Sequence, residues 1–139
     1  MSHPTITGLN HVTLAVADLR RSIVFYTHVL GFRLRAKWPK GAYLSAGALW
    51  LCLALDPKTS TARREDYTHL AFGAREDEFD GLTRRIRAAA RIWKENRSEG
   101  ASVYFLDPDG HRLELHLGSL ETRLAHCRAH PAPGLILHD

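Results

Sequence analysis

Cysteine is scarce in this sequence of 139 residues. The two cysteines, Cys52 and Cys127, lie far apart in the chain, and neither belongs to a CxxC pair. A disulfide framework requires an even set of cysteines at short spacings, and a cysteine zinc site requires paired thiolates. The sequence therefore argues against both kinds of structure.

Long apolar runs are absent as well. No segment approaches the roughly 18 consecutive apolar residues that a membrane-spanning helix needs. The first residues, 1–7, lack the basic and then apolar layout of a secretory signal peptide. We therefore expect a cytoplasmic protein that has no membrane partner.

Charge is present but not concentrated in one region. The formal net charge is +4, and Lys and Arg gather only in the short clusters Arg20-Arg21, Arg63-Arg64 and Arg84-Arg85. No basic stripe alternates with aromatic residues, so the sequence does not predict a nucleic-acid partner. A modest positive balance suits a small anionic substrate, because it raises the local concentration of that substrate.

The first half of the chain is predicted to form a strand, a helix and three further strands. β-Branched residues among apolar neighbours predict the strand over 9–17. Asp18 can cap a helix over 19–30, because its carboxylate accepts amide hydrogens of the first turn, and Gly31 suits the left-handed position after its end. Extended segments are predicted over 32–38, 42–45 and 49–55.

The same order returns after a polar, proline-containing linker over 56–66. A strand is predicted over 67–73 and a helix over 76–90, because its apolar residues lie on one side. Asp107-Pro108-Asp109-Gly110 has the composition of a turn. A short amphipathic helix is predicted over 120–128. The remaining extended segments are predicted near 92–93 and over 102–106 and 112–117.

Two tandem β-α-β-β-β modules are the simplest interpretation of this repeated order. The sequence thus predicts an α+β fold in a single domain over 1–139, with module one over about 8–55 and module two over about 66–117. Superposing the modules places His11 beside His69, since each lies early in the first strand of its module.

Strand alternation predicts a polar face with metal-binding character. Residues two apart in a strand share a face, so His11 shares a face with Thr13. In the last predicted strand the leucines take one face, which leaves Glu114 and His116 on the other. Two imidazoles and one carboxylate leave open positions, as a catalytic Lewis acid requires. Spacing alone allows either Glu114 or His116 beside His11 and His69, and a single strand histidine is more often a structural or surface residue.

Characteristic motifs occur along almost the whole chain. They span 8–16 with 18–19, 41–44, 49–53, 66–69, 96–100 and 104–114. The loop Asn-Arg-Ser-Glu-Gly and the strand Leu-Trp-Leu-Cys-Leu are the most specific of them. With these motifs the sequence resembles the fosfomycin-resistance glutathione transferases of the vicinal oxygen chelate superfamily, which are built from paired β-α-β-β-β modules.

The resemblance implies an enzyme that inactivates fosfomycin by opening its epoxide with glutathione. It assigns His11, His69 and Glu114 as ligands of a divalent metal, typically manganese(II), and leaves His116 as a neighbour. Superfamily members such as glyoxalase I use a fourth protein ligand from the last strand of module one. No carboxylate occurs over 35–55, so the resemblance implies a coordination position that is open for substrate.

Further roles follow from the resemblance, position by position. Thr13 would donate a hydrogen bond to the epoxide oxygen, and Tyr43 would assist thiol ionisation by hydrogen bonding. Trp50 and Cys52 would line the apolar side of the epoxide. The phosphonate would be bound by Lys94, Ser98, Tyr104 and Arg123, and a potassium ion by Asn96, Ser98, Gly100 and Ser102.

The resemblance also implies partners, and it leaves rival functions open. Family members pair as homodimers in which both chains complete each site, so His11 is expected to meet His69 and Glu114 of a partner chain. Bacillithiol-using and water-adding relatives share the metal triad. The missing carboxylate over 35–55 argues against hydrolysis. Rival interpretations are another vicinal oxygen chelate metalloenzyme, such as an isomerase or dioxygenase, and a drug-binding protein of the bleomycin-sequestering kind.

Overall fold

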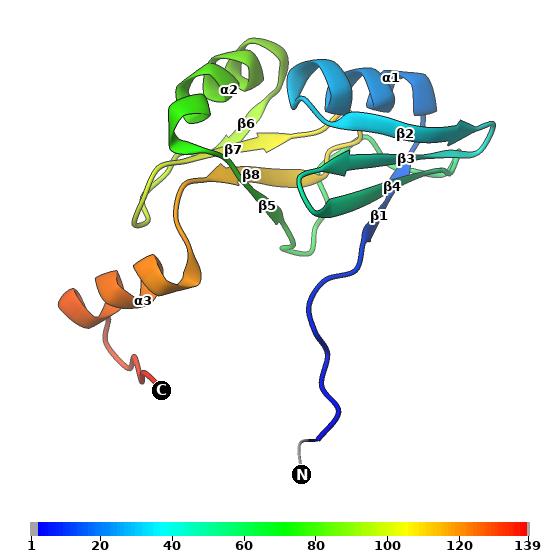
Figure 1. The fold of residues 1–139 in the computed structure, drawn as a ribbon. Helices are drawn as coiled ribbons and strands as arrows, with labels where there is room; N and C mark the ends of the chain where they lie inside the picture. Colours follow the sequence, from blue (N-terminus) through cyan, green and yellow to red (C-terminus); the bar gives the residue numbers. More distant parts are fainter. Residues whose placement is uncertain (1–2, 139) are drawn as a thin grey trace. The chain divides into compact units, whose positions relative to one another are not determined.

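A computed structural model describes residues 3–138 and divides the chain into two units. Unit 1 contains the chain up to Arg63 together with Pro108–Gly110, and unit 2 contains Arg64–Asp107 and the chain from His111 onward. Each unit carries one four-stranded sheet and follows the order β-α-β-β-β (Figure 1). The predicted α+β fold with tandem modules is therefore confirmed, while the single-domain boundary over 1–139 stays a prediction.

The sheet of unit 1 has one apolar and one open face. Its strands are β1 Val12–Val16, β2 Arg33–Trp38, β3 Gly41–Ala46 and β4 Leu49–Leu55, in the order β1-β4-β3-β2 with β1 parallel to β4. Leu44, Leu51 and Leu53 are fully buried on one face, whereas Tyr43 and Trp50 are exposed on the other. Burial of each leucine side chain contributes about 1.5–3 kcal/mol and turns that face inward.

The first helix begins as an α-helix and ends as a π-helix. The helix α1, Leu19–Val24, is capped by Asp18, whose carboxylate accepts a hydrogen bond of 3.0 Å from a first-turn amide. A π-helical turn follows over Phe25–Val29, and Gly31 comes after its end with a φ of 78°. The helix predicted over 19–30 is therefore confirmed, and its last turn is π-helical. There the Thr27 hydroxyl donates to a carbonyl one turn earlier at 2.7 Å and competes with the α-helical hydrogen bonds.

Unit 2 repeats the architecture of unit 1. Its elements are β5 Leu70–Gly73, α2 Glu76–Ala89, β6 Ile92–Lys94, β7 Ser102–Leu106 and β8 Arg112–His116. The strand order is β5-β8-β7-β6, and β5 is parallel to β8. Val103, Phe105 and Leu113 are buried in this sheet, and α2, which contacts β7, buries Phe79 and Ile86.

Both first strands begin later than the sequence predicts. β1 begins at Val12 and β5 begins at Leu70, so His11 and His69 lie immediately before their strands instead of within them. The ladder with the neighbouring parallel strand starts only at Val12 and at Leu70, which leaves the backbone of each histidine outside the sheet. The two histidines still occupy corresponding positions at the entry of the two units.

The last helix, α3, spans Leu120–Ala129 and begins with a capping box formed by Ser119 and Thr122. None of its residues is buried. The helix predicted over 120–128 is therefore present, but the described chain does not cover its apolar residues, and Leu120 is 68% exposed. No helix within residues 3–138 has both the length and the apolar character to cross a membrane.

The turn between β7 and β8 carries a buried carboxylate. Gly110 has a φ of 81°, in agreement with the predicted turn. Asp109 is fully buried and accepts hydrogen bonds from the Ala17 amide at 2.9 Å, the Ser22 hydroxyl at 3.1 Å and the Arg21 guanidinium at 3.2 Å. These donors attach the turn to the start of α1 within unit 1.

Candidate active site

One face of the sheet in unit 2 gathers polar side chains in a row across its strands. Glu114 of β8 pairs with Ala71 of β5 and with Tyr104 of β7, and Tyr104 pairs with Lys94 of β6. Residues paired across neighbouring strands project to the same side of a sheet. Glu114, Tyr104 and Lys94 therefore share one face, as strand alternation predicts for Glu114.

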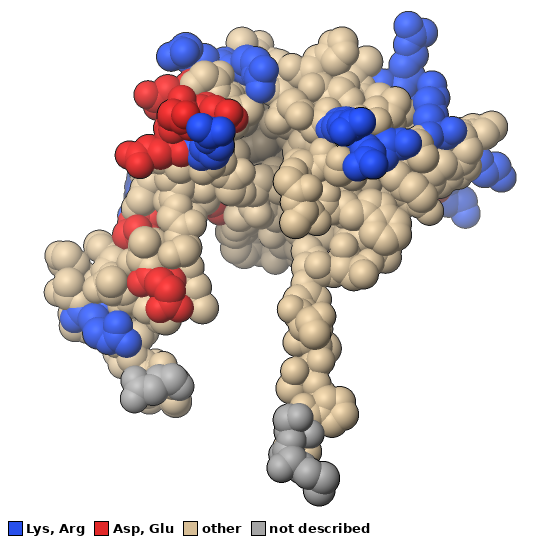
Figure 2. All heavy atoms as spheres, viewed as in Figure 1, with Lys and Arg blue, Asp and Glu red and all other residues tan. Residues whose placement is uncertain are grey.

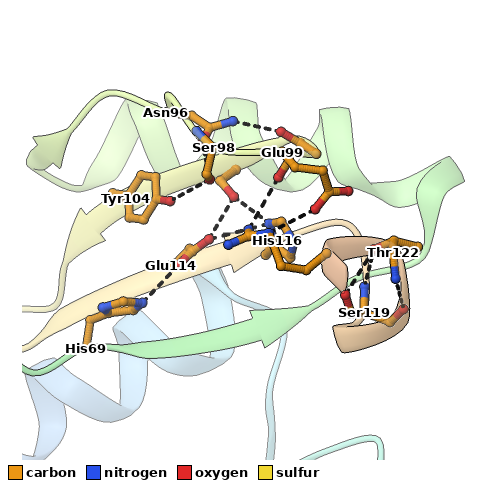
Figure 3. A network of polar contacts seen from close by, with 12 residues as sticks. His69, Asn96, Ser98, Glu99, Tyr104, Glu114, His116, Ser119 and Thr122 are labelled. Carbon is orange, nitrogen blue, oxygen red and sulfur yellow. Dashed lines mark hydrogen bonds and ion pairs between the residues drawn. The ribbon is translucent and has the colours of Figure 1, made fainter. Parts of the chain in front are cut away.

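His69 and Glu114 meet on this face (Figure 3). Nε2 of His69 lies 3.0 Å from Oε1 of Glu114, whose side chain is 8% exposed. The other ring nitrogen of His69, Nδ1, lies 2.9 Å from the Tyr67 hydroxyl. A histidine that binds a metal through Nε2 carries its proton on Nδ1, and the Tyr67 hydroxyl is in place to accept it.

The chemistry of this donor pair fits a divalent metal ion. An imidazole nitrogen and a carboxylate oxygen are ligands that Mn²⁺ and Zn²⁺ accept. Two ligands about 2.1 Å from one ion, at a right angle, lie about 3.0 Å apart, and His69 and Glu114 have this separation. Within residues 3–138 of the single chain, no three or more His, Cys, Asp or Glu side chains are arranged around one ion. A metal ion bound by His69 and Glu114 would therefore need at least one further ligand.

The second carboxylate oxygen of Glu114 faces Ser102 of β7. Ser102 Oγ donates to Oε2 at 2.7 Å and lies 2.6 Å from Nδ1 of His116, which is itself 3.5 Å from Oε2. His69 and His116 therefore lie beside different oxygens of one carboxylate. This geometry favours Glu114, and not His116, as the partner of His69.

Trp93, which lies beside His69, was not among the predicted site residues. The Trp93 ring lies 5.8 Å from the His69 ring and 5.1 Å from the Tyr104 ring. The register between β6 and β7 shifts between Ile92 and Lys94, so Lys94 pairs with Tyr104 and Trp93 lies at the irregularity. In a strand of three residues, a bulge cannot be inferred from the hydrophobic pattern, so the position of Trp93 beside His69 could not be predicted. The only indication in the sequence was that an aromatic residue precedes Lys94.

Three of the four residues expected to bind a phosphonate lie together. Lys94 Nζ is 4.9 Å from the centre of the Tyr104 ring, and Ser98 Oγ is 3.4 Å from the Tyr104 hydroxyl. The fourth residue, Arg123 of α3, forms an ion pair in which its Nε lies 3.1 Å from Oε2 of Glu99. Glu99 was not among the predicted site residues, although it belongs to one of the two most specific motifs.

The loop expected to hold potassium is closed by its own asparagine. Asn96 Nδ2 donates to the Gly100 carbonyl at 2.8 Å, and Asn96 Oδ1 accepts from the Ser98 amide at 3.0 Å and hydroxyl at 2.9 Å. Gly100 has a φ of 79°, and a Cβ there would lie 2.6 Å from the Leu117 carbonyl oxygen. Ser102, the remaining expected ligand, begins β7 and places its hydroxyl on Glu114. The loop thus brings several oxygen atoms close together, and its backbone conformation requires glycine at Gly100.

The open face of the sheet in unit 1 carries the other predicted site residues. Thr13, Cys52 and Tyr43 pair directly across β1, β4 and β3, so their side chains share this face. The Trp50 ring lies 4.3 Å from the His11 ring and 5.3 Å from the Tyr43 ring. Unit 1 by itself therefore brings all five residues to one side of its sheet.

The charged side chains visible in Figure 2 are distributed differently from one helix or strand to another. Acidic and basic side chains occur together over α2, whose first turn contains Glu76, Asp77 and Glu78. The charged side chains of β2 are all basic and exposed, namely Arg33, Arg35 and Lys37. β2 is an edge strand, and exposed basic side chains on an edge prevent pairing with other chains. The position of β2 at the sheet edge therefore explains these three basic residues, which contribute to the net positive charge of the protein.

Comparison with known proteins supports the resemblance drawn from the motifs. The chain is 51% identical over 134 residues to the glutathione transferase FosA of Serratia marcescens, covering 94% of this chain and 95% of that protein. It is 39% identical over 139 residues to the metallothiol transferase FosB of Shouchella clausii strain KSM-K16, covering 96% of this chain and 94% of that protein.

Solved structures and a family model agree with these relatives. The fold is similar to the crystal structure of the fosfomycin resistance protein FosX from Listeria monocytogenes complexed with Mn(II) and sulfate ion. That comparison has a TM-score of 0.76 and 32% identity, and covers 88% of this chain and 98% of the other. The family model matches residues 8–115. The chain therefore belongs to the Glyoxalase/Bleomycin resistance protein/Dioxygenase superfamily.

Proposed function

We propose that this protein opens the epoxide of fosfomycin with glutathione and thereby gives resistance to the antibiotic. Fosfomycin is a small epoxide that bears a phosphonate, so its enzyme needs a Lewis acid, an anion site and access for a thiol. The observation that carries the proposal is the pair of His69 and Glu114, 3.0 Å apart on the face that also presents Lys94 and Tyr104. The 51% identity to a glutathione transferase FosA supports this substrate and this thiol.

A divalent metal ion, manganese(II) or another, would be held by His69, Glu114 and His11. When bound, the metal polarises the epoxide oxygen and stabilises the negative charge that develops there. The Mn(II) complex of the FosX relative supports the choice of metal. His11 belongs to unit 1, and we propose that a second copy of the chain contributes it in a homodimer. No carboxylate over 35–55 competes with the substrate for the metal.

The phosphonate would be bound by Lys94, Ser98, Tyr104 and Arg123. Charge-assisted hydrogen bonds hold an oxyanion best, and this set offers an ammonium, a guanidinium and two hydroxyls. Lys94 and Ser98 both lie against Tyr104, so these three groups can contact one small anion. Arg123, which is paired with Glu99, would add its guanidinium from α3.

A potassium ion would occupy the loop that precedes β7. Asn96, Ser98, Gly100 and Ser102 would bind it through oxygen atoms, the ligand type that hard cations prefer. The loop already places the Gly100 carbonyl and the Ser98 hydroxyl on the Asn96 side chain. A cation there would add positive potential beside the phosphonate site.

The reaction would be attack by an external thiol on an epoxide carbon. The carbon–sulfur bond forms as the carbon–oxygen bond breaks, and the thiol proton ends on the alkoxide oxygen, which gives a hydroxy thioether. Thr13 would donate a hydrogen bond to that oxygen, and Tyr43 would hydrogen-bond the thiol as it ionises. Trp50 and Cys52, which share the open face of β4, would line the apolar side of the epoxide.

Other nucleophiles define the alternatives to glutathione. The 39% identity to a metallothiol transferase FosB supports a different thiol, such as bacillithiol, as the second candidate. A water-adding reaction needs a carboxylate base, and residues 35–55 contain none. Glutathione belongs to the reducing cytosol, so the proposal places the enzyme in the cytoplasm.

Fosfomycin consumption under three nucleophile conditions tests the proposal. Protein, manganese(II), potassium and fosfomycin are incubated with glutathione, with bacillithiol or without thiol, and products are identified by phosphorus NMR. We expect a glutathione adduct as the fastest product. Faster reaction with bacillithiol, or a diol without thiol, would reassign the nucleophile. Unchanged fosfomycin under all three conditions would refute the activity.

A further inference from the structure

We propose that His116, acting through the Ser102 hydroxyl, is a positioning residue that orients the Glu114 carboxylate toward the metal. The inference rests on the proposed metal site of His69 and Glu114. It gives a function to a histidine that spacing allowed as a ligand but that lies beside the wrong oxygen of Glu114.

A continuous set of polar contacts connects His116 to the proposed ligands (Figure 3). Nδ1 of His116 lies 2.6 Å from Ser102 Oγ, and Ser102 Oγ lies 2.7 Å from Oε2 of Glu114. The opposite oxygen, Oε1, lies 3.0 Å from Nε2 of His69. Ser102 and His116 pair directly across β7 and β8, and Glu114 precedes His116 by two residues, so the three side chains share one face.

The hydrogen-bonding capacity of the serine hydroxyl determines the direction of these contacts. A hydroxyl has one proton to donate and two lone pairs that accept. The Ser102 proton is donated to Oε2 of Glu114, so the contact with His116 must use a lone pair of Ser102, and Nδ1 must donate. His116 therefore prevents the hydroxyl from rotating away from Glu114. The second lone pair of Ser102 remains available for a potassium ion.

The His116 ring is confined by two glycines that have positive φ. A Cβ on Gly100 would lie 3.0 Å from Cε1 of His116, and a Cβ on Gly118 would lie 2.9 Å from Nε2. Gly100 and Gly118 have φ values of 79° and 138°, so side chains are disfavoured at both positions. The Leu117 amide donates to the Ala101 carbonyl at 2.9 Å and so joins the two segments that carry these glycines. The ring thus occupies a slot that backbone lines on two sides.

This confinement has a consequence for metal binding. A carboxylate that rotates freely loses conformational entropy when it binds a metal, whereas a carboxylate that is already held in the binding orientation does not. Outer partners that hold metal ligands typically change metal affinity by about 10–100-fold when they are removed. His116 and Ser102 hold Oε2, which leaves Oε1 directed at the position that His69 faces.

Two substitutions of nearly equal size separate this function from simple packing. In His116→Asn the side-chain amide can place a donor where Nδ1 lies, whereas His116→Leu has a similar volume and no donor. Affinity for Mn²⁺ is measured from the electron paramagnetic resonance signal of the free ion in potassium-free buffer. Thermal unfolding of the metal-free variants is measured in parallel.

We expect His116→Leu to weaken Mn²⁺ binding by about 10–100-fold, and His116→Asn to stay within about threefold of the parent protein. Ser102→Ala should match His116→Leu. The double variant should bind no more weakly than the weaker single variant, because both changes remove the same chain of contacts.

Three results would overturn the inference. They are unchanged Mn²⁺ affinity in His116→Leu, equal losses in the Leu and Asn variants, and additive losses in the double variant. Glu114→Gln in the same assay separates this failure from failure of the metal site: if Glu114→Gln retains full affinity, the site itself is wrong. Tight Mn²⁺ binding that depends on His116, together with no consumption of fosfomycin, would refute the proposed function and leave the inference standing.

Discussion

The two units have the same strand order, yet their open faces carry different chemistry. The rows across their sheets correspond position by position: Thr13, Cys52, Tyr43 and Ala36 in unit 1 match Ala71, Glu114, Tyr104 and Lys94 in unit 2. The row of unit 1 is neutral, and the row of unit 2 contains a carboxylate and an ammonium. Strand order therefore sets where a site can form, and the side chains decide which unit forms it.

The position of Cys52 explains the open coordination site that the resemblance implies. Cys52 stands in unit 1 where Glu114 stands in unit 2, and His11 and His69 precede the corresponding first strands. A carboxylate at position 52 would make the two units chemically alike. With Cys52 there, the proposed metal ligands are two histidines and one carboxylate, which would leave a coordination position for a substrate oxygen.

The largest expected effect comes from removing the carboxylate that is present in the row of unit 2 and absent from the row of unit 1. Glu114→Gln keeps the shape of the side chain and removes the anionic ligand, so we expect metal-dependent turnover of fosfomycin to fall by about 10³-fold or more. The measurement is the initial rate at saturating manganese(II), with circular dichroism to show that the fold is retained. Retained activity would show that the assignment of Glu114 is wrong.

A complementation experiment tests whether the units of two chains cooperate. His11→Ala and Glu114→Gln proteins, each inactive alone, are mixed in equal amounts, unfolded and refolded together. If His11 serves the partner chain, random pairing regenerates one intact site in about half of the dimers, or about a quarter of the wild-type activity. No recovery, in a mixture shown to contain heterodimers, would place all ligands in one chain.

Converting unit 1 toward unit 2 sharpens the same comparison. Cys52→Glu should supply a fourth ligand, tighten Mn²⁺ binding and lower fosfomycin turnover by about 10²-fold, because the substrate loses its coordination position. Cys52→Gln, which has the same size without the charge, is the control. Equal turnover in the two variants would show that position 52 does not face the metal.

A buried carboxylate in unit 1 should serve stability and not the site. Asp109→Ala leaves the Ala17 amide and the Ser22 hydroxyl without their acceptor, so we expect the free energy of unfolding to fall by about 2–3 kcal/mol. Arg21, whose side chain is 45% exposed, should contribute little. Denaturant unfolding measures the loss, and Mn²⁺ affinity of the folded variant should not change. If the Asp109→Ala variant kept its full stability but lost affinity for Mn²⁺, the assignment of Asp109 to stability and not to the site would be contradicted.

The smallest expected effect comes from Lys94, whose positive charge distinguishes the β6 end of the row in unit 2 from the neutral β2 end of the row in unit 1. Lys94→Ala replaces the ammonium with the residue type found at Ala36, and we expect the KM for fosfomycin to rise about 10-fold with little change in kcat. Lys94→Arg, which keeps the charge, is the control. An unchanged KM in Lys94→Ala would remove Lys94 from the phosphonate site.

The elements and their faces could be predicted largely from local signals. The Asp18 cap, the positive φ of Gly31 and the turn before β8 depend on neighbours in sequence, and alternation correctly placed Glu114 opposite buried leucines. The π-helical turn escaped prediction, because helix periodicity does not distinguish it from an α-helical end. The late starts of β1 and β5 were also not predicted, because the ends of a strand depend on where its pairing with the partner strand begins.

The site depended on contacts that span the chain. His69 and Glu114 meet although 45 positions separate them, Arg123 meets Glu99 across a strand pair, and Trp93 reaches His69 only through a bulge. None of these pairings has a local signature, because each joins residues that are brought together by strand register or by the packing of segments far apart in the chain.

The sequence by itself determined the tandem modules, the polar face and, through its motifs, the family. Periodicity, turn residues and caps act over a few residues, so these features can be inferred without a structure. Only the tertiary structure decided which oxygen of Glu114 faces His69 and which faces Ser102 and His116. The orientation of a side chain is set by partners on other strands, whose positions the local sequence does not encode.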